Sequence, residues 1–306
     1  MCRTGTRTAC ALIAAALAVI ATRSQAQELE PRAYSASPVG TNFVVAGWTR
    51  LRGEVLTDPA LPIKNVQADI DVYVAGYART FELAGRTASA AAVLPFARGE
   101  VSGDVFDASR EVHRSGIGDA RLRLALNLYG NPAMTPREFA QRPPGLVVGT
   151  SVSMVVPTGQ YVPERLVNVG THRWAFKPEV GFSYPVGNWF FEASAGAWLY
   201  TDNDNFFGGK HRSQDPLYVT QVHAGYNFRP GLWLAVNAAH NSGGRTTIDG
   251  VGSNDRQNNS RYGATLSVPF TAGWSAKLAW SKGAQIRAGG DYDVIAVALQ
   301  YRWFDK

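Results

Sequence analysis

The chain is poor in cysteine: Cys2 and Cys10, the only two, both lie at the N-terminal end of the 306 residues. Removal of residues 1–26 leaves no thiol for a disulfide or a metal site. Cys10 precedes an apolar run rather than following one, which argues against a lipoprotein site. Stability must therefore come from packing and from closure of the fold rather than from covalent cross-links.

Long apolar runs and clustered bases are also missing. After residue 26 no stretch of about 18 consecutive apolar residues occurs, so the sequence offers no transmembrane helix there. The formal charge of +6 includes Arg3, Arg7 and Arg23, which leaves a mild and scattered +3 for the rest. We therefore expect no nucleic-acid partner. With 31 glycines and only three methionines, the composition resembles a barrel wall more than a leucine-rich soluble core.

The first 26 residues have the pattern of a signal peptide. Arg3 and Arg7 give a positive start, and the apolar run 11–21 is too short to span a bilayer. Ser24-Gln25-Ala26 fits a cleavage site, so we expect export and a cut after Ala26. An uncleaved anchor helix is the alternative. Residues 27–306 are long enough for one large domain.

The remainder of the chain alternates between apolar and polar residues, as strands do. About twelve runs are long enough to cross a membrane as tilted strands. We expect strands at 43–56, 66–83, 87–102, 117–130, 146–156, 173–184, 189–201, 216–228, 232–241, 261–270, 274–281 and 292–304.

The connections between these runs alternate in length. Short turns such as "AGR", "PVGN", "RPG" and "TAG" alternate with long polar loops, and only the fourth connection breaks the phase. This layout is typical of an antiparallel transmembrane β-barrel of the outer membrane, with short turns on the periplasmic side. A soluble β-sandwich with crossing connections has no reason to keep that phase.

Two segments on the periplasmic side need separate treatment. In the fourth connection, 131–145, Thr135-Pro136 with Glu138 predicts a capped, short periplasmic helix that ends before Pro143-Pro144. Residues 27–40 are predicted to be a periplasmic arm or a segment that plugs the barrel, and the sequence leaves both open.

Residue parity predicts which face meets lipid. Leu122 and Leu124 share one face of their strand, and Arg121 and Arg123 share the other. A base on the lipid face costs roughly 2–4 kcal/mol near the bilayer midplane, so the charged face should line the lumen. Aromatic residues next to the short turns predict a periplasmic interfacial girdle: Phe182, Tyr184, Trp189, Tyr226, Phe228, Phe270, Trp274, Tyr301 and Trp303.

The charges of lumen parity are the candidate site residues, and they either tune a channel or form an ion-paired network that fills a narrow barrel. We predict a partly filled interior with a narrow path. The predicted lumen-lining residues are Arg121, Arg123, Lys177, Glu179, Glu192, Arg261, Lys277 and Arg302. No metal-ligand spacing appears, and we expect neither a cofactor nor a metal.

Several segments resemble one family. They are "GIGDARLRLALNLYG", "VVGTSVSMVVPTGQY", "NVGTHRWAFKPEVGFSYPVGNW", "WLYTDNDNFFGG", "QDPLY", "FRPGLWLAVNAAHNSGGRTTIDG" and "SRYGATLSVPF". Together they resemble the outer-membrane transporter family of the MetA-pathway of phenol degradation. The resemblance implies a Gram-negative outer-membrane barrel and uptake of aromatic or other hydrophobic compounds. One departure is the end of the chain, where Asp305 and Lys306 follow the aromatic Phe304.

Two local patterns suggest other chemistry. His240 and Ser242 share the predicted lipid-facing side near the outer rim, in an arrangement similar to that of outer-membrane lipid hydrolases, where His activates Ser. The expectation is nevertheless that the protein is not an enzyme. Asp202 and Asp204 alternate as in a calcium loop but lack the glycine and glutamate of an EF-hand.

The sequence therefore predicts passive passage of small hydrophobic or aromatic solutes through an outer-membrane barrel. A lipid hydrolase using His240 and Ser242 and a non-conducting structural or sensing barrel are the alternatives. The expected partners are outer-membrane lipid, the barrel assembly machinery and the solute.

Overall fold

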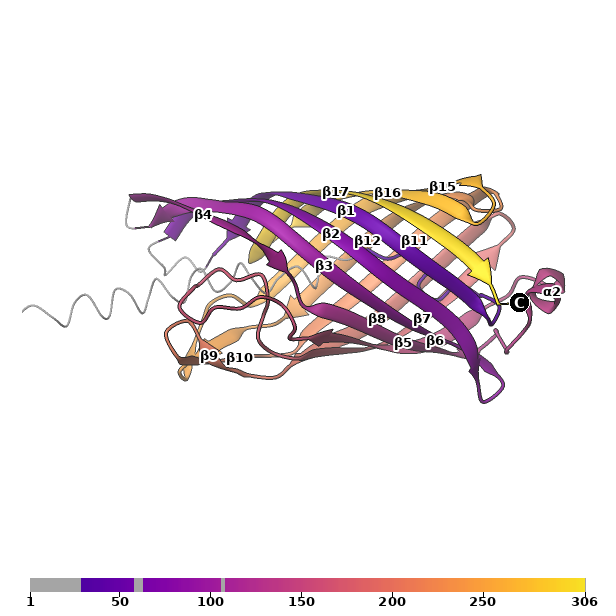
Figure 1. Ribbon diagram of the computed structural model, residues 1–306, viewed down its shortest axis with the longest axis horizontal. Helices are drawn as coiled ribbons and strands as arrows, with labels where there is room; N and C mark the ends of the chain where they lie inside the picture. Colours follow the sequence, from indigo (N-terminus) through magenta and orange to yellow (C-terminus); the bar gives the residue numbers. More distant parts are fainter. Residues whose placement is uncertain (1–28, 58–62, 106–107, 306) are drawn as a thin grey trace, which may run out of the picture.

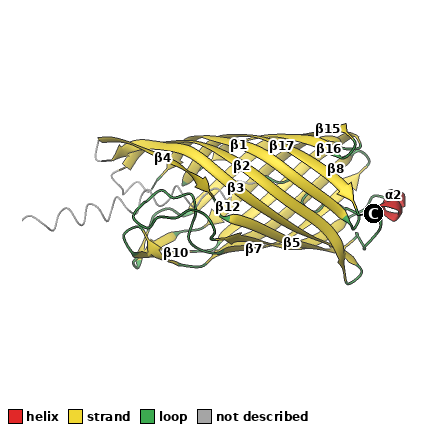
Figure 2. Ribbon diagram, in the orientation of Figure 1, coloured by secondary structure: helices red, strands yellow, loops and turns green. Residues whose placement is uncertain are grey.

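The computed structural model describes residues 29–57, 63–105 and 108–305, so the predicted signal peptide and Lys306 lie outside the described residues. Within these ranges the strands close into a 12-strand antiparallel barrel (Figure 1). Figure 2 shows that strands make up almost the whole wall and that the one labelled helix lies outside it, at one end.

Each predicted strand corresponds to one strand of the ring, with ends shifted by a few residues. The ring runs in the order β1 (Thr41–Leu56), β2 (Ile63–Leu83), β3 (Arg86–Val105), β5 (Ala120–Tyr129), β6 (Val147–Val156), β7 (Ala175–Val186), β8 (Trp189–Tyr200), β11 (Leu217–Arg229), β12 (Leu232–Gly243), β15 (Gln257–Thr271), β16 (Trp274–Gln285) and β17 (Gly289–Phe304). The first and last strands pair from Thr41↔Phe304 to Leu56↔Gly289, which closes the wall. Closure leaves these two strands without a free edge.

The sequence predicts a loop between the strands 87–102 and 117–130. This prediction is wrong in part, because the segment contains a strand. β4 (Ala108–Ile117) pairs with the far half of β3, from Phe96↔Ile117 to Val105↔Ala108. β4 and β5 lie along the same edge of β3 and are separated by Gly118 and Asp119. The charged sequence of β4 has no apolar alternation, so periodicity could not reveal this strand.

Two predicted polar loops also contain short strands. β9 (Asn203–Phe206), β10 (Lys210–Gln214), β13 (Thr246–Ile248) and β14 (Val251–Gly252) form a four-stranded sheet in the order β14-β13-β10-β9. Phe206, Ile248 and Leu166 form an apolar cluster at this sheet. The sheet stands at one end of the barrel, which we call the loop end (Figure 1).

The opposite end, which we call the α2 end, carries the helix and the C-terminus (Figure 1). Helix α2 (Pro136–Gln141) lies in the fourth connection, where the sequence predicts it. Thr135 is the N-cap, and its side chain and that of Glu138 form a reciprocal capping box. Among the described residues, no helix has the length and apolar content to cross a bilayer.

The strands present apolar side chains outward. Leu122 and Leu124 are 36% and 52% exposed, whereas Glu179 on the inner side is only 6% exposed. Outward aromatic rings form a continuous row near the α2 end, where successive centroids are 4.9 to 6.4 Å apart: Phe270, Trp274, Tyr301, Trp303 and Tyr77. Such a row is the interfacial girdle of an outer-membrane barrel.

Candidate functional site

The barrel encloses a cavity of about 530 Å³. Its wall comes from strands all around the ring, and Leu29, Glu30 and Ala33 of the N-terminal segment also line it. A cavity of this volume lies within the range of about 300–1,000 Å³ that is usual for small-molecule sites. The cavity is therefore the candidate functional site.

Four of the predicted lumen residues line this cavity: Arg121 and Arg123 on β5, and Lys177 and Glu179 on β7. The Nζ atom of Lys177 lies 2.9 Å from Oε2 of Glu179, and Nη2 of Arg123 lies 3.9 Å from Oε1 of the same carboxylate. Charges withdrawn from water need such partners, because the desolvation cost otherwise exceeds the gain from their attraction. Arg123, Lys177 and Glu179 therefore form an ion-paired network, which is one of the two interpretations that the sequence allows.

The N-terminal segment 29–40 borders the cavity and contacts the ion-paired network. The Tyr34 hydroxyl donates to Oε1 of Glu179 at 2.9 Å and lies 2.9 Å from Oγ of Ser151. Farther along the segment, the backbone N–H of Val39 donates to the carbonyl oxygen of Met134 near α2. Of the two placements that the sequence leaves open, these contacts match a segment that plugs the barrel.

The wall is shaped to receive Tyr34. A Cβ atom added at Gly181 would lie 2.4 Å from the Tyr34 ring, and one added at Gly149 would lie 2.8 Å from it. Real Cβ atoms do not approach so closely, so only glycine leaves room for the ring at both positions. Tyr34 is only 4% exposed and contacts the network, so it is a buried anchor of the plug.

Arg32 is the second anchor of the plug. Its guanidinium carbon lies 4.2 Å from the ring centroid of Phe190 and 5.0 Å from that of Trp233. Its backbone N–H donates to Glu192, and Oγ of Ser35 donates to the other oxygen of that carboxylate at 2.8 Å. Glu192, which the sequence predicts as a lumen-lining charge, holds the plug through these contacts.

The three remaining predicted residues lie apart from the network. Lys277 on β16 interacts electrostatically with Glu30 of the plug. Arg302 is exposed near the end of β17, with its guanidinium 5.4 Å from the Phe304 ring centroid, and thus lies at the mouth of the α2 end. Arg261 occupies a separate niche.

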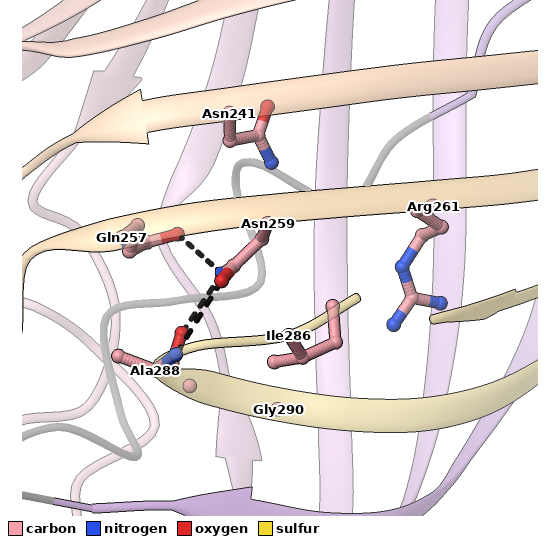
Figure 3. A pocket seen from close by; sticks show the side chains of 8 residues that line it. Asn241, Gln257, Asn259, Arg261, Ile286, Ala288 and Gly290 are labelled. Carbon is pink, nitrogen blue, oxygen red and sulfur yellow. Dashed lines mark hydrogen bonds between the residues drawn. The ribbon is translucent and has the colours of Figure 1, made fainter. Parts of the chain in front are cut away.

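The niche around Arg261 has a free volume of about 10 Å³, roughly the space for one water molecule. Nη1 of Arg261 donates to Oγ of Ser281 at 3.3 Å and to the carbonyl oxygen of Tyr292 at 2.9 Å. Figure 3 shows the polar side chains of Asn259 and Gln257 beside it, joined by a hydrogen bond. The niche is too small to take a solute.

At the loop end, Asp119 joins the wall to the 157–174 loop. Its Oδ1 accepts the backbone N–H of Gly159 at 2.9 Å, and its Oδ2 accepts the N–H and hydroxyl of Thr171 at 2.8 and 2.6 Å. Arg173 follows and is 3% exposed, with its guanidinium 4.4 Å from the Tyr200 ring centroid. Burial and, after it, the nearby cation of Arg212 lower the pKa of Arg173 to about 9. Val169 and Thr171 of this loop line the cavity, so the loop forms part of its wall at this end.

The predicted His240–Ser242 pair is arranged differently from a hydrolase pair. The ring of His240 contacts Ser260 on β15, whose Oγ lies 3.0 Å from Nδ1. Asp202 and Asp204, which alternate as in a calcium loop, both contact His211: each carboxylate lies within 3.5 Å of a ring nitrogen of this residue.

Two residues that the sequence did not single out belong to the cavity. Trp198 on β8 and Gln221 on β11 line it and are 4% and 7% exposed. Both have inward parity within strands that the sequence predicts, so parity alone could have found them. They were missed because only charged residues were considered as lumen candidates.

The chain matches, over residues 40–295, the family described as "Putative MetA-pathway of phenol degradation". In fold it is similar to the COG4313 outer membrane channel from Pseudomonas putida F1, with a TM-score of 0.76 and 23% sequence identity over 90% of this chain and 100% of that chain. It is also similar to the β domain of the Bordetella autotransporter BrkA, with a TM-score of 0.50 and 12% identity over 87% of this chain and 100% of that chain. A search of curated proteins finds no match.

At these identities the two structural likenesses support the fold alone, that of an outer-membrane β-barrel. The family match is broader, since it extends from the start of the barrel wall into β17. The chain therefore belongs to the family of the MetA-pathway of phenol degradation.

Proposed function

We propose that the protein is a passive channel for small hydrophobic or aromatic compounds. The observation that carries this proposal is the cavity of about 530 Å³ inside the barrel, which has apolar wall residues and is large enough for a single-ring compound. The relative from P. putida is named an outer membrane channel, and the family description refers to phenol degradation, which is consistent with this use.

The path runs along the barrel axis. A solute reaches the cavity from the loop end and leaves past the N-terminal segment at the α2 end. Because Tyr34 and Arg32 hold that segment against the wall, passage needs the segment to move aside. We expect the resting protein to conduct ions poorly, since the plug and the ion-paired network fill much of the cross-section.

The loop end is predicted to face the cell exterior, and the short turns the periplasm. This orientation follows from the length of the connections, because outer-membrane barrels have long outer loops and short periplasmic turns. The predicted cleavage after Ala26 would leave the plug at the start of the exported chain. The barrel assembly machinery would insert that chain into the outer membrane.

The decisive experiment is uptake by cells whose outer membrane is intact. Cells that produce the protein should take up radiolabelled single-ring compounds at low concentration faster than cells that lack it. A small, strongly hydrophilic sugar serves as the control solute and should show no difference. Equal uptake of the ring compounds in both strains would contradict the channel and leave the non-conducting barrel as the better account.

A further inference from the structure

The 157–174 loop, which joins β6 to β7, reaches across the barrel at the loop end. Its residue Val167 is 8% exposed and belongs to a buried apolar cluster, which we call the wall cluster. The other buried members of the wall cluster come from β1, β2, β3 and β17, and β17 lies opposite β7 in the ring: Leu51, Val55, Val66, Ala68, Val101 and Tyr292. The loop therefore extends across the lumen toward the opposite wall.

The wall cluster adjoins the cavity on its loop-end side. Leu51 is a buried member of the cluster and also lines the cavity. Val72 and Val294 pack against the cluster and line the cavity as well. Val55 lies farther along β1, toward the loop end. Val167 and the wall cluster therefore lie between the loop end and the cavity.

Asp119 holds the two ends of the loop together. Its carboxylate accepts hydrogen bonds from the N–H of Gly159 on one side and from the N–H and hydroxyl of Thr171 on the other. The two chain segments touch here, because a Cβ atom added at Gly159 would lie 2.7 Å from Cα of Gly170. Residues 159–171 are therefore a compact loop with a closed neck, the form of an Ω-loop.

The tip of the loop is braced from within. Oδ1 of Asn168 accepts the N–H of Val162 at 2.9 Å, and Nδ2 donates to the carbonyl oxygens of Val162 and Arg165 at 3.1 and 2.6 Å. Side-chain bonds to the backbone of this kind hold a loop in one conformation without a strand ladder. The tip can therefore move as one body about the neck.

Two adjacent tip residues belong to different clusters. Leu166 packs in the cluster with Phe206 and Ile248 of the four-stranded sheet, whereas Val167 packs in the wall cluster. Arg114 on β4 also holds the tip, since its Nε donates to the carbonyl oxygen of Val167 at 2.8 Å. Apolar contact is non-directional, so Val167 can leave the wall and return without breaking a strand ladder.

We propose that residues 159–171 form a gate at the loop end, with Asp119 holding its neck and Val167 closing it. In the closed state Val167 fills the wall cluster and blocks the way from the loop end to the cavity. Opening withdraws Val167 from the wall while Asp119 keeps the neck in place. This gate is separate from the plug at the α2 end. The proposal rests on the proposed function, because it assigns the gate to the route by which a solute enters.

Thiol labelling of purified protein in lipid nanodiscs tests the contact of Val167 with the wall, since the chain has no cysteine after residue 26. Val167→Cys should react with a charged maleimide at least about tenfold more slowly than Val251→Cys, because a buried residue reacts only when its segment opens. Val251 is the matched control, since it is a valine of the four-stranded sheet that is 73% exposed. Equal rates for the two variants would overturn the gate.

The neck has its own variant. Asp119→Ala combined with Val167→Cys should be labelled faster than Val167→Cys alone, because the neck loses the carboxylate that joins Gly159 to Thr171. An unchanged rate would contradict the role of Asp119. Heat-modifiable gel mobility should show a closed barrel in every variant.

Single-channel recording tests whether Val167 closes the path. The Tyr34→Ala background serves here, because we expect it to loosen the plug at the other end. In that background Val167→Asp should raise the open probability, because a carboxylate in an apolar cluster must find a partner or return to water. Val251→Asp should behave like Tyr34→Ala alone. Equal open probability in the Val167→Asp and Val251→Asp proteins would contradict the gate.

Uptake by intact cells separates the two proposals. If cells with the protein take up ring compounds faster but Val167→Cys is labelled as fast as Val251→Cys, the channel stands and the gate is wrong. If Val167→Cys is protected and Val167→Asp raises the open probability, but the protein does not accelerate uptake, the gate stands and the channel for ring compounds is wrong.

Discussion

The hydroxyl of Tyr34 lies 2.9 Å from the Oε1 atom of Glu179, and this contact joins the N-terminal segment to the ion-paired network of the barrel wall. The same carboxylate forms an ion pair with Lys177, whose Nζ lies 2.9 Å from Oε2. One buried acid therefore both organises the lumen and holds the plug. A change that moves the plug must also disturb the charges along the cavity.

Loss of the Tyr34 ring should open the α2 end. Tyr34→Ala removes a buried aromatic side chain, a change that typically costs about 3–5 kcal/mol, and here the loss falls on docking of the plug rather than on the closed wall. Single-channel recording in planar bilayers should show a larger or longer-lived open state than in the wild type. Tyr34→Phe keeps the ring and should have a smaller effect. Equal conductance in all three proteins would show that Tyr34 does not hold the plug.

A single added methyl group at Gly181 should have a similar effect. In Gly181→Ala the Cβ atom would lie 2.4 Å from the Tyr34 ring, so the plug must shift. Limited proteolysis at 29–40 should be faster than in the wild type. Gly145→Ala is the matched control, because a Cβ atom there meets nothing within 4 Å. Protection in both variants would contradict the close fit.

The orientation of the barrel can be tested on intact cells. Epitope tags within 203–213 and 245–258, at the loop end, should bind antibody without permeabilisation. A tag within 133–144, which contains α2, should become accessible only after the outer membrane is broken. Surface labelling of the 133–144 tag on intact cells would show that the predicted strand phase is reversed.

The hydrolase alternative makes a separate prediction. His240 contacts Ser260 at 3.0 Å, and we expect Ser242 to have no catalytic role. Ser242→Ala should therefore leave the lipid A and phospholipid profiles of the cell unchanged in mass spectra. Accumulation of substrate lipid or loss of a deacylated species in this variant would favour hydrolysis over transport.

The wall of this protein could be predicted from sequence because lipid imposes a strict rule. Every strand must alternate, and a buried charge such as Arg123 must point away from the acyl chains. That rule located all twelve strands and placed Arg121, Arg123, Lys177 and Glu179 on the inner face, where they line the cavity. The helix at Pro136 was predictable because its capping box is a local signal.

Other parts could not be predicted, because their stability comes from contacts between distant segments. Residues 29–40 have no periodicity, and their place depends on Gly149 and Gly181, more than a hundred residues away. β4 has charged side chains that hide any alternation, and the strands of the sheet β14-β13-β10-β9 have only two to five residues, too few to show a period.

The inward direction of Arg121 and Arg123 gives the most direct test of an ion path through the lumen. Both line the cavity, whereas Leu122 and Leu124 on the same strand are 36% and 52% exposed on the lipid side. In the Tyr34→Ala background, Arg121→Glu with Arg123→Glu should move the reversal potential toward cation selectivity, because charges that line a pore set the sign of the favoured ion. The same change at Leu122 and Leu124 should instead impair assembly, seen as loss of heat-modifiable gel mobility, because a base on the lipid face costs about 2–4 kcal/mol and an acid somewhat less. If both double variants impaired assembly equally and neither moved the reversal potential, the inward direction of the arginines and the ion path would both be wrong.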